Sequence, residues 1–450
     1  MNKTPRDSAV RVLYKIEFEK GFSNISLSAE IVSAWLSDLD KGFLIELVYG
    51  VIEKKVTLDY FISRFSKVPV RKLHDYVLII LRISVYQMVY MDKVPSYSIC
   101  NEAVLLAKKY RSQNAGYVNA TLRAMSSGKL EVPAFSNKLF HSKNRFLSVK
   151  YSLPEWLIER WNVEFGSEKA EAIFESTALK PRFAIRVNIT KIGATELLES
   201  LKLKGFKGVF SGIFENSLII ENPAGIINSD EFAKGYFYVQ DEAASLVSKV
   251  LSPVEFEKIL DTCSAPGGKA THIAELIGNK AVIIACDIYT HKIKLIQENI
   301  ERLGHTSVKP KLEDTSVFNP EFNEVFDRVL LDVPCSGTGL LSRKPEIRWQ
   351  RKEQDFAELN KIQTELLNNC SKYLKVGGTM VYSTCSIDKA ENEAIIESFL
   401  ESHKNFELIG FDALLPDVLK NRGAIEGKLT LYPYLDGCDG FFISKLRRKS

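Results

Sequence analysis

Two cysteines lie in segments whose composition suits nucleophilic chemistry. Cys335 is part of DVPCSGTG at 332–339, and Cys385 is part of STCS at 383–386. The thiolate is the reactive form of cysteine, and a helix N-terminus or a cationic neighbour favours it. A single buried cysteine is most simply a small apolar side chain. Two cysteines, each after an apolar run and beside acidic residues, favour a site for covalent catalysis instead.

A glycine-containing turn near the middle of the chain predicts a cofactor site. Residues 260–277 read LDTCSAPGGKATHIAELI, which predicts a strand, a tight turn and a helix. Gly267 and Gly268 let the backbone approach a ligand closely, and the helix N-terminus offers N–H groups to a carboxylate. The turn matches neither GxGxxG nor GxxxxGK[ST], so the sequence disfavours a nicotinamide cofactor and a P-loop nucleotide site.

Three acidic residues fall where neighbouring strands are expected to end. Asp287 lies 20 residues beyond Gly267, where a carboxylate can accept hydrogen bonds from ribose hydroxyls. Asp314 falls near the end of a further strand, where it could accept from an adenine amino group, although a helix N-cap is an equally simple interpretation. Asp332 ends the strand before the first cysteine motif. The position of Asp287 fits an adenosine-type cofactor, and a Rossmann-type oxidoreductase would show much the same pattern.

The elements that must position these residues alternate between strand and helix from residue 238 onward. Apolar runs predict a strand ending at Leu260, and the further strands expected are 281–287, 325–332, 378–383 and 440–446. This alternation is typical of a doubly wound α/β domain with a parallel sheet, in which ligands bind at the carboxyl ends of the strands. Parallel neighbours would bring the two cysteines, 50 residues apart, into one cleft.

The residues after the second cysteine predict a helix. Asp388 and Glu391 resemble a capping box, and apolar residues continue at helical spacing through Phe399. A helix starting there would favour the thiolate of Cys385.

Length and composition indicate a large soluble protein. At 450 residues the chain is too long for one core, so two or three domains are expected. An apolar content of 45% and a charged content of 26% are those of a globular protein. No segment reads as a signal peptide or membrane span, so we expect a cytoplasmic protein. The seven cysteines include no Cys-x-x-Cys pair, which argues against a disulfide framework or a zinc site.

The first 130 residues predict a helical bundle. Apolar residues recur at helical spacing, with Pro69 and Pro95 as breaks. Residues 1–140 hold 20 Lys and Arg against 13 Asp and Glu, a net charge of +7 in a chain that carries +4 overall. A basic domain suits contact with phosphates, and a solvated basic surface explains the charge equally well.

The middle of the chain predicts a small α+β module. A helix is expected over 151–161 with Ser152 as its cap, followed by a strand over 182–188 and a helix over 195–203. Side chains that could face nucleic acid, or could equally be solvated strand edges, are Arg182, Arg186, Phe206 and Lys207.

The expected domain boundaries are 1–140 for the bundle, 141–237 for a linker helix and the module, and 238–450 for the α/β domain. The segment RKPEIRWQRK at 343–352 follows the first cysteine motif directly. Its basic residues could hold phosphates and Trp349 could stack a base, the alternative being a surface helix with incidental charges.

Three motifs together resemble a known family. DTCSAPGGK at 261–269, DVPCSGTG at 332–339 and STCS at 383–386 are similar, in order and in position, to signature motifs of the RNA 5-methylcytosine methyltransferases of the NSUN/RsmB superfamily. One departure is Ser264, where the family often has alanine, and a small side chain is retained.

The first domain resembles the NusB family of helical RNA-binding domains. The matching features are RxxA at 6–9, KGFxxELVYG at 41–50, NEAVxxAK at 101–108 and GYVNATLR at 116–123. With this domain in front, the chain resembles the bacterial 16S rRNA cytosine-C5 methyltransferases of the superfamily.

The resemblance implies a fold and an activity. The fold is an all-α NusB-like N-terminal bundle, a small α+β module and a C-terminal Rossmann-like class I methyltransferase domain. The activity is methylation of C5 of a specific cytosine in 16S rRNA with S-adenosyl-L-methionine as cofactor. Cys385 would add to C6 of the base, Cys335 would assist product release, and Asp332 could also touch the cytosine. The implied cofactor-binding residues are Cys263, Ser264, Ala265, Pro266, Gly267, Gly268, Lys269, Asp287, Asp314 and Asp332.

Several alternatives stay open on the residues alone. The residues do not show which of the two cysteines is the nucleophile, because DNA cytosine methyltransferases use a Pro-Cys cysteine, the counterpart of Cys335. An RNA-binding or antitermination-type factor without catalysis, and a methyltransferase acting on another RNA or on DNA, are the competing functions. The expected partner is 16S rRNA, without metal or membrane, and the expected oligomeric state is a monomer.

Overall fold

The structure, a computed structural model, describes residues 4–19, 21, 23–34, 36–136 and 138–450. This described part of the chain divides into two compact units. Unit 1 contains the residues up to Leu179 together with 341–353, and unit 2 contains 180–340 and 354–450. Among the residues described, no helix is both long enough and apolar enough to cross a membrane.

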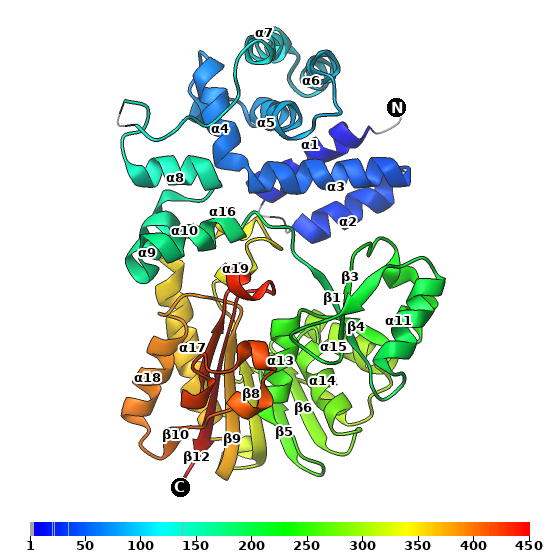
Figure 1. Ribbon diagram of the computed structural model, residues 1–450, viewed down its shortest axis with the longest axis vertical. Coiled ribbons are helices and arrows are strands. Elements are labelled where there is room, and N and C mark those ends of the chain that lie inside the picture. The colour runs from blue at the N-terminus through cyan, green and yellow to red at the C-terminus, as the bar shows by residue number, and fades with distance from the viewer. Residues whose placement is uncertain (1–3, 20, 22, 35, 137) are drawn as a thin grey trace. The chain divides into compact units, whose positions relative to one another are not determined.

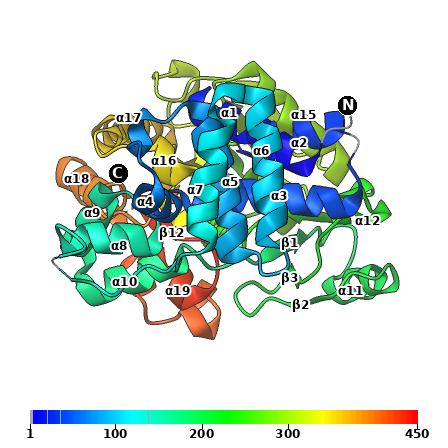
Figure 2. The same ribbon diagram turned by 90° about the horizontal axis from the view of Figure 1, so that it is seen from above.

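Unit 1 is helical, with α5 at its centre (Figures 1 and 2). Its first helices are α1 (Pro5–Phe18), α2 (Ser23–Ala34), α3 (Asp38–Glu53), α4 (Lys55–Phe65), α5 (Asp75–Tyr90), α6 (Ser96–Arg111) and α7 (Ala115–Ser126). Every residue of α5 from Val77 to Gln87 is buried, because α1, α3, α4, α6 and α7 pack around it. The charged residue in this run, Arg82, is neutralised by Asp59 and Glu17 at 2.7 and 2.6 Å. The all-α bundle expected here is confirmed.

Shorter helices follow in unit 1, and one expected cap is wrong. They are α8 (Lys143–Tyr151), α9 (Glu155–Phe165) and α10 (Ser167–Ser176). Ser152 does not cap α9. Its φ of 52° is left-handed, so it ends α8, and its hydroxyl accepts a hydrogen bond from the N–H of Val56 at 3.1 Å. Pro154 occupies the N-cap of α9 and makes no side-chain cap bond.

The basic segment at 343–352 is part of unit 1, where it forms α16 (Ile347–Gln350). Arg348 is 1% exposed, and its guanidinium donates to the carbonyl groups of Thr177 at 2.6 Å and Ser152 at 3.3 Å. The indole N–H of Trp349 donates to the carbonyl of Ile52 at 2.6 Å. The hypothesis that Arg348 holds a phosphate is therefore wrong, because the guanidinium is buried and both of its Nη atoms donate to backbone carbonyls inside the unit.

Unit 2 contains a small antiparallel sheet with the order β2-β3-β1-β4. Its elements are β1 (Phe183–Val187), α11 (Ala194–Leu203), β2 (Gly208–Phe210), β3 (Ser217–Ile220), α12 (Asp230–Ala233) and β4 (Phe237–Val239). Leu197 and Leu201 of α11 share a core with Ile185 of β1, and the expected α+β module is confirmed. Arg186 is fully buried, so neither interpretation of it as a surface residue holds.

The larger sheet of unit 2 has the order β10-β12-β9-β8-β5-β6-β7, with β11 paired to β12. Its strands are β5 (Lys258–Asp261), β6 (Val282–Asp287), β7 (Val308–Leu312), β8 (Phe326–Asp332), β9 (Leu374–Thr384), β10 (Phe406–Leu408), β11 (Lys428–Leu431) and β12 (Phe441–Arg448). Strands β5 to β9 are parallel, as expected, whereas β12 runs antiparallel to β9, β10 and β11.

Helices cover both faces of this sheet, which confirms the doubly wound fold (Figure 1). The helices are α13 (Glu242–Leu251), α14 (Gly268–Leu276) and α15 (Thr290–Leu303) on one face, and α17 (Asp355–Ser371) and α18 (Glu393–Ser402) on the other; α19 (Pro433–Asp436) is a short helix before β12. Successive residues of β5 pack on opposite faces of the sheet: Ile259 packs with α13 to α15, and Leu260 packs with α17 and α18.

Candidate active site

The glycine turn lines a cavity at the carboxyl end of β5. The N–H of Gly267 donates to the carbonyl of Ser264 at 2.7 Å, and α14 begins at Gly268. Gly267 has a φ of +97°, and a Cβ on Gly268 would lie 2.9 Å from the ring of Tyr238, so both positions require glycine. The residues around this cavity of about 220 Å³ are Tyr238, Val239, Gln240, Asp261, Cys263, Ser264, Ala265, Pro266, Gly268, Lys269 and Asp332. All the cofactor residues expected on the turn except Gly267 therefore meet at one cavity.

Asp287 and Asp314 do not line this cavity. Asp287 ends β6, next to β5, where it accepts a hydrogen bond from the N–H of Tyr289 and lies 3.6 Å from the ammonium of Lys292. Asp314 lies two residues beyond β7, and one carboxylate oxygen accepts from the N–H and the hydroxyl of Ser316 at 3.0 and 2.6 Å. Asp314 thus caps a turn and not a helix, and the ribose and adenine roles of the two acids stay predictions.

Asp261 is a site residue that the sequence interpretation missed. It is fully buried at the end of β5 and lines the cavity, and neither carboxylate oxygen meets a donor in hydrogen-bond geometry within the described part of the chain. Burial raises the pKa of Asp261 to about 7. A signal was present in the sequence, because Asp261, like Asp287 and Asp332, is the last residue of a strand.

Lys269 and Asp332 form an ion pair inside the cavity. The ammonium nitrogen of Lys269 lies 2.6 Å from one oxygen of Asp332, and the other oxygen accepts from the hydroxyl of Ser383 at 2.8 Å. Burial alone would lower the pKa of Lys269, but the Asp332 carboxylate outweighs burial and the pKa is raised. The ion pair fixes the end of β8 against the start of α14.

The two motif cysteines lie side by side just beyond the ends of β8 and β9. Asp332 pairs with Ser383 in the parallel register, so the segments after them leave the sheet together. The sulfur atoms of Cys335 and Cys385 are 3.2 Å apart. Cys335 is buried and Cys385 is half-buried. The hydrogen bond with Cys385 and burial raise the pKa of Cys335 well above the usual thiol value.

Glu391 accepts hydrogen bonds from the loop that contains Cys335 and does not form the expected capping box. α18 begins at Glu393 with no side-chain cap, eight residues beyond Cys385, so the cysteine is not at its N-terminus. The buried Glu391 carboxylate instead accepts from the N–H of Ser336 at 2.7 Å, from its hydroxyl, and from the amide of Gln363 at 3.0 Å. The hydrogen bond from Ser336, 55 residues earlier in the chain, thus replaces the local capping box of Asp388 and Glu391 that the sequence pattern predicted.

The other thiols of unit 2 are poor nucleophiles. Burial raises the pKa of Cys263 to about 12, and it raises the pKa values of Cys286, Cys370 and Cys438 as well. Cys263 lines the cavity, and its raised pKa disfavours it as a nucleophile.

Comparison with known protein families gives three adjoining matches. The model of the 16S rRNA methyltransferase RsmB/F family matches residues 248–447, the NusB family model matches 3–127, and the model of the RsmF/B-like ferredoxin-like domain matches 153–227.

Whole-chain relatives agree with these matches. A curated Bacillus subtilis protein, a probable ribosomal RNA small subunit methyltransferase B, is 37% identical over 100% of both chains. The ribosomal RNA small subunit methyltransferase B of Klebsiella pneumoniae is 33% identical over 92% of this chain and 91% of its own. Among solved structures, that of PH0851 covers 100% of both chains at 28% identity with a TM-score of 0.84.

The fold and the site define a methyltransferase domain that follows a NusB-type domain and a ferredoxin-like module. With a relative 37% identical along its whole length, the chain belongs to the 16S rRNA methyltransferase RsmB/F family.

Proposed function

We propose that this protein transfers a methyl group from S-adenosylmethionine to C5 of one cytosine in 16S rRNA, through a covalent bond between Cys385 and C6. The observation that carries the proposal is the pair of thiols 3.2 Å apart at the ends of β8 and β9. The neighbouring Lys269–Asp332 pair joins them to the glycine-lined cavity. The curated names of the relatives support small-subunit ribosomal RNA as the substrate.

The cavity residues fit the amino-acid end of S-adenosylmethionine. Asp261 offers a fully buried carboxylate on the wall of the cavity, which suits an α-ammonium group. The N–H groups at the start of α14 suit an α-carboxylate. We assign the ribose to Asp287 and the adenine amino group to Asp314 from their places after β6 and β7. When bound, this cofactor supplies an electrophilic methyl group.

Cys385 makes C5 of cytosine reactive. Its thiolate adds to C6, so that an S–C6 bond forms and the electron pair of the C5=C6 double bond moves to C5. Once C5 carries the methyl group, a base removes the C5 proton, the double bond re-forms and the S–C6 bond breaks. The greater exposure of Cys385 supports it as the attacking thiol, because the base must reach it.

Cys335 assists release of the product. Its raised pKa keeps it protonated at neutral pH, and its S–H can donate to the sulfur of Cys385 at 3.2 Å. The same donor stabilises the thiolate that departs from C6. Lys269 and Ser383 hold the carboxylate of Asp332 in place, and we assign this carboxylate a contact with the cytosine ring.

The RNA substrate must present an unstacked base, because Cys335 is buried and Cys385 is half-buried, and an enzyme cannot reach its target atom inside a duplex. The NusB-type domain, with its excess of basic residues, is the part we assign to the RNA backbone.

The test is transfer of labelled methyl groups to undermethylated 16S rRNA, with mapping of the product. We expect incorporation at C5 of a single cytosine, and much less into competing DNA or transfer RNA. Calorimetry with S-adenosylmethionine distinguishes the enzyme from a non-catalytic RNA-binding factor, which would bind RNA without the cofactor. Absence of incorporation by folded, cofactor-binding protein would contradict the proposal.

A further inference from the structure

Arg186 is a fully buried cation that the proposed mechanism does not use. It lies on β1 of the small sheet, with no exposed surface. A guanidinium has five N–H donors in a rigid fork. A buried cation is costly unless every donor is matched, so the acceptors that surround it indicate what it does.

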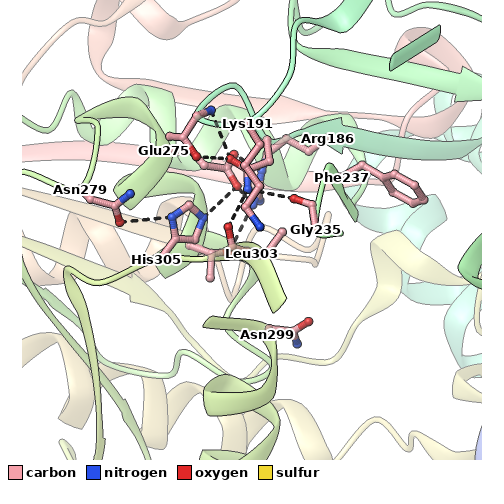
Figure 3. A network of polar contacts seen from close by, with 12 residues as sticks. Arg186, Lys191, Gly235, Phe237, Glu275, Asn279, Asn299, Leu303 and His305 are labelled. Carbon is pink, nitrogen blue, oxygen red and sulfur yellow. Dashed lines mark hydrogen bonds and ion pairs between the residues drawn. The ribbon is translucent and has the colours of Figure 1, made fainter. Parts of the chain in front are cut away.

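Two of the donors hold a buried carboxylate. Nε and one Nη of Arg186 donate to the two oxygens of Glu275 on α14 at 2.9 and 2.8 Å (Figure 3). The same carboxylate lies 3.3 Å from the ring of His305, which in turn contacts Asn279. Burial alone would raise the pKa of Glu275, but Arg186 outweighs burial and the pKa is lowered, so the pair is ionised. This bidentate pair neutralises the charge of Arg186.

The remaining donors reach the cofactor turn and the segment that faces it. Arg186 donates to the carbonyl of Gly268 at 2.7 Å, to the hydroxyl of Thr271 at 3.2 Å and to the side-chain carbonyl of Gln240. Its guanidinium also lies 5.2 Å from the ring centre of Tyr238. All of these partners belong to unit 2.

These partners are walls of the cavity to which we assigned the cofactor. Tyr238, Gln240 and Gly268 all line it. Tyr238 leaves no room for a side chain on Gly268, so a small movement of either wall changes the shape of the cavity. Neutralisation of Glu275 alone would require only two N–H donors. The remaining N–H groups of Arg186 donate to the first turn of α14 and to Gln240.

We propose that Arg186 is a positioning residue for the cofactor: from the small sheet it fixes the start of α14 and the Tyr238–Gln240 segment in the geometry that S-adenosylmethionine needs. The proposal rests on the assignment of the cavity to S-adenosylmethionine. It predicts that cofactor affinity depends on a module that contributes no thiol and no acid to the reaction.

The first test is Arg186→Lys, studied by calorimetry with S-adenosylmethionine and by steady-state kinetics. The ammonium of lysine can neutralise Glu275 but cannot also reach Gly268 and Gln240. We expect the dissociation constant and the KM for S-adenosylmethionine to rise about tenfold or more, with kcat at saturating cofactor within about twofold of wild type. A purely structural role would lower the melting temperature and leave the KM unchanged.

A second variant separates folding from positioning. Replacing a buried ion pair by apolar side chains of similar volume is often neutral for stability, so Arg186→Met/Glu275→Met is expected to fold. It too should bind S-adenosylmethionine at least about tenfold more weakly. The matched control is Lys191→Ala. Lys191 belongs to the same network of polar contacts (Figure 3) and follows β1, and its ammonium group donates to the carbonyls of Lys234 and Arg302, not to the glycine turn. Its loss should leave the dissociation constant within about twofold of wild type.

The outcomes distinguish this inference from the proposed function. Wild-type protein that binds no S-adenosylmethionine contradicts the proposed function itself. Wild-type binding together with near-normal binding by either folded Arg186 variant overturns only the positioning role. Failure of both variants to fold also overturns it, because Arg186 would then be needed for the fold and not for the cavity in particular.

Discussion

Cofactor binding should depend on pH through Asp261. Burial raises its pKa to about 7, and neither oxygen meets a donor in the described part of the chain. An ammonium group entering the cavity needs the ionised carboxylate, so binding below pH 7 must expel the proton. Each pH unit below 7 therefore weakens binding about tenfold, which corresponds to about 1.36 kcal/mol, or about a hundredfold at pH 5. Above about pH 8 the α-amino group of the ligand itself loses its proton, and affinity should fall again.

The assay is calorimetric titration with S-adenosylmethionine from pH 5 to pH 8 in two buffers of different ionisation enthalpy. Wild-type protein should release about one proton per binding event at pH 5 and about half a proton at pH 7, and the release should decline further above pH 7. Asp261→Asn should bind weakly and lose this proton release. The matched control is Asp327→Asn on the same sheet: Lys375 and a backbone N–H overcome the effect of burial and hold the pKa of Asp327 below its usual value, so it stays ionised throughout. A pH-independent dissociation constant for wild type would contradict the role of Asp261 in cofactor binding.

The same shift predicts the stability of the ligand-free protein. The folded pKa of Asp261, about 7, exceeds the unfolded value of 3.8, so the folded state binds the proton more tightly. Stability should therefore fall as pH rises from about 4 to 7 and level off above, by up to about 4 kcal/mol for three pKa units. Asp261→Asn should remove this slope, which thermal unfolding at a series of pH values measures directly.

Three further substitutions test other parts of the account. A Cβ on Gly339 would lie 2.1 Å from the carbonyl oxygen of Gly440, so Gly339→Ala should cost about 3 kcal/mol in chemical denaturation, whereas Gly42→Ala, with nothing within 4 Å, should be neutral or stabilising. Glu391→Ala removes the acceptor for the N–H of Ser336 and should lower kcat about tenfold with an unchanged KM for the cofactor. An unaltered kcat would show that Glu391 does not position the loop that contains Cys335. Arg348→Met should destabilise the protein by about 1–3 kcal/mol without changing the salt dependence of RNA affinity, whereas a flatter salt dependence would mean that Arg348 does meet phosphates.

Local sequence patterns were sufficient for the frame of the site. The apolar runs predicted β6 and β8 within one residue at each end, and the glycine turn predicted the cavity. Parallel pairing of neighbouring strands predicted that the two cysteines meet. In the structure Asp332 of β8 pairs with Ser383 of β9, so the segments that carry the two cysteines leave the sheet side by side. These features follow from hydrophobic periodicity and turn chemistry, which are local.

What the sequence could not reveal are partners far along the chain. Arg186 and Arg348 were interpreted as surface cations, yet their acceptors include Glu275, 89 residues away, and Thr177, 171 residues away. Glu391 matched a local capping pattern, but its carboxylate binds Ser336, 55 residues earlier. In each case a tertiary hydrogen bond overrode a local preference, and composition does not distinguish a cation that meets phosphate from one that meets buried carbonyls.

In the proposed mechanism, Cys385 attacks the base and Cys335 helps to release the product. The most direct measurement is denaturing electrophoresis of protein incubated with 16S rRNA and S-adenosylmethionine, for wild type, Cys385→Ala and Cys335→Ala. We expect no turnover and no adduct for Cys385→Ala, and an RNA adduct that survives denaturation for Cys335→Ala. An adduct that accumulates with Cys385→Ala and is absent with Cys335→Ala would contradict this mechanism and exchange the roles of the two thiols.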